Sequence, residues 1–191
     1  MKLLENKIIN LASAIKTLVY YLIRPRGIGS IGNSVRIALP RKIRGKHISI
    51  DDRAVVASYA WIEAIEQYGN QSFKPKIYIG KDVHIGRYAT ITAVNEICIG
   101  DGCLFSEHVY ISDHTHDVFT NSQLPLVKMP LIEKGKVSIG NNCFIGFRAI
   151  IMPGVTLGDR CVVGAASVVT RSFPPKSVLA GTPARLLRTL K

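Results

Sequence analysis

The sequence predicts an all-β chain folded as a solenoid of short parallel strands, and three observations lead to this prediction. Aliphatic residues recur at every sixth position over much of the chain, glycine often follows them, and small residues lie four positions after them. An amphipathic helix repeats its apolar residues at three and four positions, so it does not produce a period of six. A fixed short period is typical of solenoids, in which each unit packs only on its neighbours.

Length and composition set the first limits on the chain. Its 191 residues predict one domain, and the 47% hydrophobic share is enough for a packed core. The longest apolar run, residues 18–23, is far shorter than the roughly 20 residues of a membrane span. Asn10 and Ser13 interrupt the apolar stretch 8–15, which makes it a poor signal peptide. We therefore expect a cytoplasmic location.

Residues 1–26 are expected to form an N-terminal amphipathic helix. Apolar residues alternate at spacings of four and three, at Leu4, Ile8, Leu11, Ile15, Leu18 and Leu22. This spacing places them on one helix face. Two interpretations stay open: the face packs on the protein or a neighbouring subunit, or the basic segment 3–23 makes peripheral contact with the inner membrane through its anionic lipids.

Residues 27–176 carry the six-residue repeat. The clearest copies begin at Ile139, Ile145, Ile151, Leu157, Val163 and Val169, and earlier copies begin at Ile79, Ile85, Ile91 and Ile97 before the phase shifts to Ile99, Phe105 and Ile111. Six residues hold one short strand and a corner, and three such units close a triangle. Successive coils then stack about 4.8 Å apart, with the aliphatic residues pointing inward. Residues 177–191 are expected to form a C-terminal tail.

The four cysteines fit the core of this solenoid. Cys103, Cys143 and Cys161 occupy the small position of the repeat, and Cys98 follows Ile97 in an expected strand. No pair has the spacing of metal ligands. We interpret them as small apolar residues and expect no resident metal.

The largest interruption of the repeat is the loop 112–136. It opens with His114 and His116 between Asp113 and Asp117. A loop of this length inside a compact fold is uncommon unless it is functional. Three interpretations compete, namely a metal site, a solvated polar turn and acid–base catalysis. Imidazole titrates near neutral pH, which favours catalysis.

Two stretches resemble a known family. Residues 109–116, VYISDHTH, and residues 137–146, VSIGNNCFIG, are similar to the sugar O-acetyltransferases of the hexapeptide-repeat superfamily, most closely to those that modify lipopolysaccharide O-antigen and capsule sugars. The resemblance implies a left-handed parallel β-helix over roughly residues 27–185. It also implies that His114 is the general base, with His116 and Asp117 able to orient it.

The same resemblance implies the reaction and the acceptor side of the site. The acetyl group of acetyl-coenzyme A passes directly to a sugar hydroxyl of a surface polysaccharide or its precursor, with no covalent acyl-enzyme. Family members place an Asn one coil away to position the acceptor. Thr92, Asn95 and Asp113 are the candidates here.

The closing segment resembles the cofactor end of the family. It comprises residues 163–171, VGAASVVTR, and residues 180–185, AGTPAR. In the family the last coils hold the pantetheine, and a Thr-Lys pair and tail arginines meet the phosphates. The residues implied for coenzyme A are Phe144, where the family often carries Trp, and Gly146, Ala165, Thr170, Arg171, Arg185 and Arg188. Arginine suits phosphates because it binds them with two parallel N–H groups.

Partners follow from the shape and from the resemblance. A triangular prism presents flat faces, and the resemblance implies a homotrimer with active sites between subunits. The net charge of +12 is compatible with nucleic acid, but aromatic residues make up only 7% of the chain and no recognised binding module is present, so we expect no nucleic-acid partner.

Two other activities remain open. An amino-sugar N-acetyltransferase is a close alternative, because a neutral imidazole serves an amine as well as a hydroxyl. A zinc hydratase of the γ-carbonic-anhydrase type shares the solenoid and would draw on His84, His108 or His114. Such a hydratase needs neither the loop 112–136 nor the arginine-rich tail, so the sequence favours the acetyltransferase.

Overall fold

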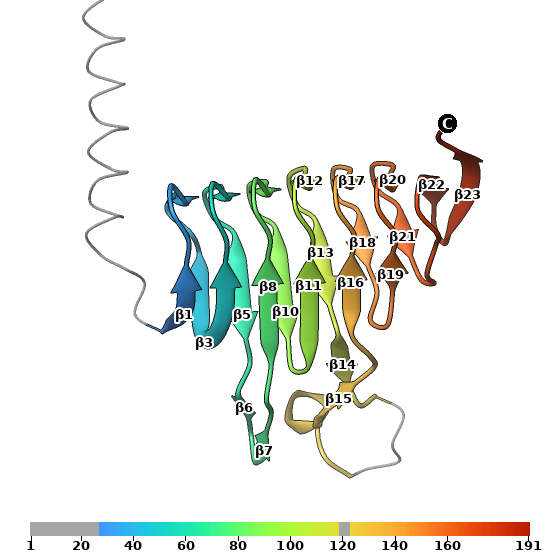
Figure 1. Ribbon diagram of the computed structural model, residues 1–191. Coiled ribbons are helices and arrows are strands. Elements are labelled where there is room, and N and C mark those ends of the chain that lie inside the picture. The colour runs from blue at the N-terminus through green and yellow to red at the C-terminus, as the bar shows by residue number, and fades with distance from the viewer. Residues whose placement is uncertain (1–26, 119–122) are drawn as a thin grey trace, which may run out of the picture.

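The protein is a left-handed parallel β-helix, in which one coil after another stacks along a straight axis (Figure 1). The computed structural model describes residues 27–118 and 123–191, so the expected N-terminal helix lies outside the described residues. No helix among the described residues is long and apolar enough to cross a membrane.

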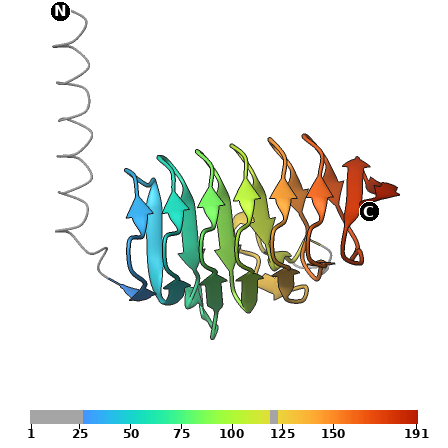
Figure 2. The same cartoon turned by 45° about the horizontal axis from the view of Figure 1, so that its top comes forward.

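Each coil contributes strands to three faces, which Figure 2 shows from a second direction. Face A contains β1 (Ile28–Ile31), the second half of β3 (Lys42–Ile50), β8 (Lys76–Ile79), β11 (Glu96–Ile99), β16 (Val137–Ile139) and β19 (Thr156–Leu157). Face B contains β2 (Arg36–Ile37), β4 (Val55–Val56), β9 (His84–Ile85), β12 (Leu104–Phe105), β17 (Phe144–Ile145), β20 (Val162–Val163), β22 (Ser177–Gly181) and β23 (Ala184–Thr189). Face C contains the first half of β3, β5 (Trp61–Ala64), β10 (Thr90–Ala93), β13 (Tyr110–Ser112), β18 (Ile150–Ile151) and β21 (Val168–Val169).

The core confirms the six-residue pattern. The aliphatic residues of the clearest copies, from Ile139 to Val169, are at most 2% exposed, and the small positions Cys143, Ala149 and Cys161 are buried beside them. Equivalent residues of successive coils lie directly opposite one another, as Ile99 does Ile139 and Ile139 does Leu157. The side chains therefore form continuous apolar ladders inside the prism.

Polar side chains at the edge between faces A and B join neighbouring coils. Asp101 accepts the backbone N–H of Lys81 at 2.8 Å, Asn141 accepts that of Asp101 at 2.8 Å, and Asp159 accepts that of Asn141 at 2.7 Å. Each side chain satisfies a corner N–H group that no strand partner takes, which lets the corners stay tight.

Between Ile50 and Leu157 the irregular spacing of the coils lies at one edge, where face C leads into face A, here called the CA edge. From Ile50 to Leu157, the buried residues are six positions apart at each step from face A to face B and from face B to face C. The steps from face C to face A vary, at 17 residues (Ile62 to Ile79), 8 (Ile91 to Ile99), 28 (Ile111 to Ile139) and 6 (Ile151 to Leu157). Insertions at this edge leave the stacked core undisturbed.

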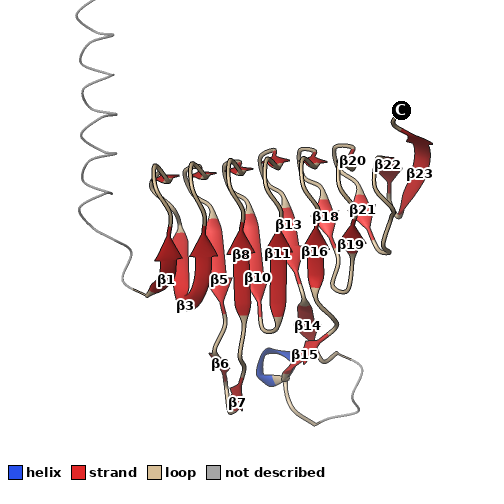
Figure 3. Cartoon of the chain, viewed as in Figure 1, coloured by secondary structure: helices blue, strands red, loops and turns tan. Residues whose placement is uncertain are grey.

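The two long insertions both form antiparallel hairpins that project from the same side of the prism (Figure 3). The first contains β6 (Gln67–Tyr68) and β7 (Gln71–Ser72), and the second contains β14 (His114–His116), the 3₁₀ helix η1 (Leu126–Lys128) and β15 (Leu131–Glu133). The expected loop 112–136 is thus partly ordered as a β-ladder. The expected tail 177–191 supplies β22, which pairs with β20, and β23, which folds back on β22.

Candidate active site

Asp113 is the buried anchor at the start of the second insertion. Its carboxylate is fully buried and accepts the backbone N–H of Val94 at 2.9 Å and that of Asn95 at 2.8 Å. Val94 and Asn95 form the two-residue corner of the preceding coil on the CA edge. These two bonds fix the point at which the insertion leaves the solenoid.

His114 is oriented by the same carboxylate. Its Nδ1 lies 3.0 Å from Asp113 Oδ1, and its side chain is 10% exposed. A carboxylate only accepts hydrogen bonds, so this contact places the proton on Nδ1 and leaves Nε2 as the acceptor. Nε2 makes no hydrogen bond to a described residue. Every buried side-chain nitrogen and oxygen in the described part of the chain has a partner, so Nε2 reaches the surface.

Ser112 holds the backbone beside this imidazole. Its hydroxyl donates to the carbonyl oxygen of His114 at 2.9 Å and accepts the N–H of His114 at 3.2 Å. The turn from β13 into β14 is therefore closed by a side chain as well as by the carboxylate. Thr92, an expected acceptor residue, lies directly opposite Ser112 on β10 and is 7% exposed.

The β14–β15 ladder pairs His114 with a second acidic residue. Glu133 lies directly opposite His114, and its Oε1 accepts a hydrogen bond from the side-chain amide of Asn95. Asn95, expected from the sequence on the acceptor side, therefore links Asp113 to the residue paired with His114. Glu133 is not predicted by the sequence, because its position depends on how the two strands of the insertion pair.

His116 and Asp117 have other neighbours. The exposed ring of His116 lies edge-on to Tyr68 at 5.5 Å, and the N–H of Asp117 donates to the carbonyl of Pro130 at 2.9 Å. Asp113 contacts the ring of His114 directly. The group that orients His114 in the structure is therefore Asp113, whose fully buried carboxylate is not exposed to an acceptor.

Thr170 and Arg171 lie on the CA edge with His114, in the corner that follows β21. Both are exposed, and the guanidinium of Arg171 lies 5.1 Å from the centre of the Phe173 ring. Arg185 and Arg188 are exposed on β23 at the end of the solenoid. Within the described residues none of these three arginines forms an ion pair with a carboxylate.

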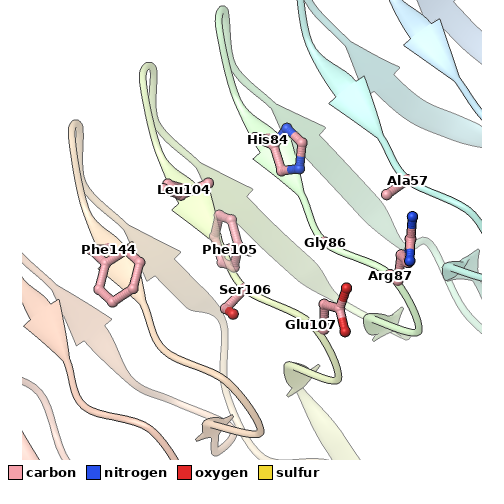
Figure 4. A pocket seen from close by; sticks show the side chains of 9 residues that line it. All are labelled: Ala57, His84, Gly86, Arg87, Leu104, Phe105, Ser106, Glu107 and Phe144. Atoms are coloured by element: carbon pink, nitrogen blue, oxygen red, sulfur yellow. The ribbon is translucent and has the colours of Figure 1, made fainter.

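The other expected cofactor residues lie on a different side of the prism. Phe144 points outward from β17 on face B, Gly146 follows that strand, and Ala165 lies in the equivalent corner of the next coil. Phe144 lines an open groove of about 500 Å³, together with His84, Leu104 and Arg87 among others (Figure 4). Face B is opposite the CA edge in a triangular coil, so one chain does not bring Phe144 to His114.

The histidines considered for zinc are also apart. His84 lies on face B, His108 in the corner between faces B and C, and His114 on the CA edge. His108 stacks on Tyr88 with ring centres 4.8 Å apart. Residues 27–118 and 123–191 contain no group of three or more His, Cys, Asp or Glu side chains placed to hold a metal ion.

The hairpin β6–β7 is also not predicted by the sequence, and it contacts the second insertion through Tyr68 and Gln71. The available signal was the step of 17 residues between Ile62 and Ile79, which is too long for one corner and not a multiple of six.

Comparison with known proteins agrees with this architecture. Residues 136–171 match the family model described as the hexapeptide repeat of succinyl-transferase. The chain is 35% identical over 137 residues to a galactoside O-acetyltransferase of Escherichia coli K12, covering 72% of this chain and 64% of the relative. It is 32% identical over 118 residues to a putative lipopolysaccharide biosynthesis O-acetyl transferase, WbbJ, of the same organism, covering 59% and 60%. The chain thus spans less than two thirds of each of these relatives.

A solved structure extends the likeness in fold to almost the whole chain. A variant of AntD, an N-acyltransferase from Bacillus cereus, superimposes with a TM-score of 0.73 over 90% of this chain and 89% of AntD, at 22% identity. The repeat, the solenoid and the two relatives together show that the chain carries a hexapeptide-repeat β-helix similar to that of acetyltransferases named for sugars and for lipopolysaccharide biosynthesis.

Proposed function

We propose that the protein transfers an acetyl group from acetyl-coenzyme A to a hydroxyl of a surface-polysaccharide sugar or its precursor, with His114 as the general base. The observation that carries the proposal is the imidazole of His114, which is held at Nδ1 by a buried carboxylate while Nε2 reaches the surface. This arrangement is what a neutral base needs in order to accept a proton from an alcohol.

The reaction then runs through one tetrahedral intermediate. Nε2 of His114 removes the proton of the sugar hydroxyl while the oxygen attacks the thioester carbonyl. The carbon–sulfur bond breaks, and the thiolate takes the proton back from the imidazolium. Asp113 stabilises the imidazolium because its carboxylate lies 3.0 Å from Nδ1.

The relatives support the sugar acceptor. Both curated relatives are named O-acetyltransferases, one acting on galactosides and the other in lipopolysaccharide biosynthesis. AntD is named an N-acyltransferase, in a complex with dTDP and coenzyme A, so an amino sugar is the second candidate acceptor. The two candidates differ in the product, because an ester is cleaved by hydroxylamine at alkaline pH and an amide is not.

Coenzyme A is proposed to run from His114 toward the end of the solenoid. Thr170 and Arg171 share the CA edge with His114, and the exposed arginines of β23 lie beyond them. Arginines without a carboxylate partner are suited to the phosphates of the cofactor.

A homotrimer with shared active sites explains why the expected cofactor residues are divided. Phe144 and Gly146 on face B are remote from His114 in one chain, but face B of one subunit is free to meet the CA edge of the next. Exposed Leu104 and Phe144 give face B an apolar strip for this contact. Contact of residues 3–23 with the inner membrane, and a cytoplasmic site of action, are further parts of the proposal.

The test is an acceptor screen. The purified protein is incubated with acetyl-coenzyme A and nucleotide sugars, lipid-linked oligosaccharides and simple glycosides, and thiol release is followed. Acceptor-dependent release with a hydroxylamine-sensitive product supports O-acetylation, and a resistant product identifies the N-acetyl alternative.

A further inference from the structure

The strand β15 has an outer edge that its own hairpin leaves unpaired. In the β14–β15 ladder the N–H of Asp117 donates to Pro130 and the N–H of Lys134 donates to Asp113. Hydrogen-bonded and non-bonded pairs alternate in an antiparallel ladder. Leu131, opposite His116, is therefore in a non-bonded pair, and its own N–H and C=O point away from β14.

The side-chain amide of Gln71 forms hydrogen bonds with both of these groups. Its Nε2 donates to the carbonyl oxygen of Leu131 at 3.0 Å, and its Oε1 accepts the N–H of Leu131 at 2.7 Å. Leu131 is only 5% exposed, so little water is available to replace these bonds. One side-chain amide from β7, 60 residues away in the chain, thus acts on β15 as a neighbouring strand would.

A second residue of the same hairpin reinforces this contact. Tyr68 on β6 donates its hydroxyl to the carbonyl of Val127 at 3.4 Å, and its ring lies against the ring of His116. The hairpin is closed at its base by a bond from Phe73 N–H to the carbonyl of Glu66 at 2.9 Å. The first insertion therefore contacts the second at η1, at β14 and at β15.

We propose that Gln71 is a positioning residue for His114. Its two hydrogen bonds hold β15 in place, and β15 in turn holds β14 through the ladder. The imidazole of His114 is thereby kept at the angle that the acceptor requires. The inference rests on the proposed function of His114. Asp113 and Asn95 hold the second insertion where it leaves the solenoid. Gln71 holds it farther along the ladder, at the pair of His116 and Leu131. Displacing a catalytic group by about 1 Å can cost 10²-fold in rate.

The test compares three variants of the full-length protein. Gln71→Met keeps the length of the side chain and removes both hydrogen bonds, whereas Gln71→Glu keeps the acceptor for the N–H of Leu131. Gln67→Met is the matched control, since Gln67 is exposed on the same hairpin and its side chain makes no hydrogen bond within the described residues. Amide hydrogen exchange of Leu131 is measured together with kcat and the KM for acetyl-coenzyme A.

We expect exchange at Leu131 to become at least about tenfold faster in Gln71→Met, and kcat to fall about tenfold to 10²-fold with an unchanged KM for the cofactor. Gln71→Glu should recover part of both quantities, and Gln67→Met should match the wild type. Wild-type exchange and kcat in Gln71→Met overturn the inference. An inactive wild type with faster exchange in Gln71→Met would instead refute the proposed function, and a fall in stability without a selective loss of kcat would make Gln71 merely structural.

Discussion

The Oδ1 atom of Asp113 lies 3.0 Å from Nδ1 of His114, and the same carboxylate is held by two backbone N–H groups of the preceding coil. The orientation of the proposed base is therefore determined by the stacking of two coils and not by the loop alone. Two consequences follow, one for catalysis and one for stability.

Asp113→Asn is expected to reduce kcat by about 10²-fold or more, because an amide cannot stabilise the imidazolium as a carboxylate does. It should also destabilise the fold by about 1.5 to 3 kcal/mol, since hydrogen bonds to a buried charge are lost. Asp101→Asn is the control, because Asn141 already performs the same capping on the next coil. Steady-state kinetics and urea unfolding measure both effects, and wild-type kcat in Asp113→Asn would remove Asp113 from the account.

The cofactor assignment predicts a selective effect of three arginines. Replacing Arg171, Arg185 or Arg188 by Ala should raise the KM for acetyl-coenzyme A about tenfold per phosphate contact and leave the KM for the sugar nearly unchanged. The comparison with acetyl-dephospho-coenzyme A identifies which arginine meets the 3′-phosphate, because that variant should lose its effect with the truncated cofactor. Equal effects on both cofactors would exclude contact with the 3′-phosphate.

Shared active sites predict complementation between two inactive variants. His114→Ala removes the base, and Phe144→Ser alters the face proposed to complete the site of the next subunit. After the two are unfolded together and refolded, about a quarter of the interfaces of a random trimer combine two intact halves. Light scattering should give three times 21.0 kDa for each variant. Activity that stays at the level of the separate variants would contradict a shared site.

The repeat made the fold accessible from the sequence because a six-residue period is a local property. Within each copy, such as those at Ile145 and Val163, the aliphatic position alone predicts which residue points inward. The buried ladder then follows from the stacking of the coils. His114 was accessible for a similar reason, since it stands where the repeat breaks.

The partners of His114 were less accessible, because they come from other coils. The role of Asp113 depends on the backbone of Val94 and Asn95, and that of Gln71 on a strand 60 residues later. The separation of Phe144 from His114 follows from the position of face B around the prism. The second insertion lies between His114 and Phe144 in the chain, and its length is not a multiple of six. The six-residue period alone therefore does not predict on which face Phe144 lies relative to His114.

The thiols offer a test of the packing around face A. Burial raises the pKa of Cys98, and its hydrogen bond to Glu96 raises it further. Burial also raises the pKa of Cys161, so both groups carry little thiolate near about pH 8. Native protein should react slowly with a disulfide reagent, faster as the pH rises, while unfolded protein should release all four thiols at once. Glu96→Gln should lower the pKa of Cys98 and speed its reaction, and an unchanged rate would show that Glu96 does not act on this thiol.

The role of His114 is tested most directly by acceptor-dependent release of coenzyme A, compared between the wild type and His114→Ala at saturating acetyl-coenzyme A. If His114 is the general base, His114→Ala loses 10²- to 10⁴-fold in kcat while it still folds and binds the cofactor, because His114 lies outside the stacked core. A kcat of His114→Ala within about threefold of the wild-type value would be too small a decrease for the loss of a general base. It would contradict the assignment of this role to His114.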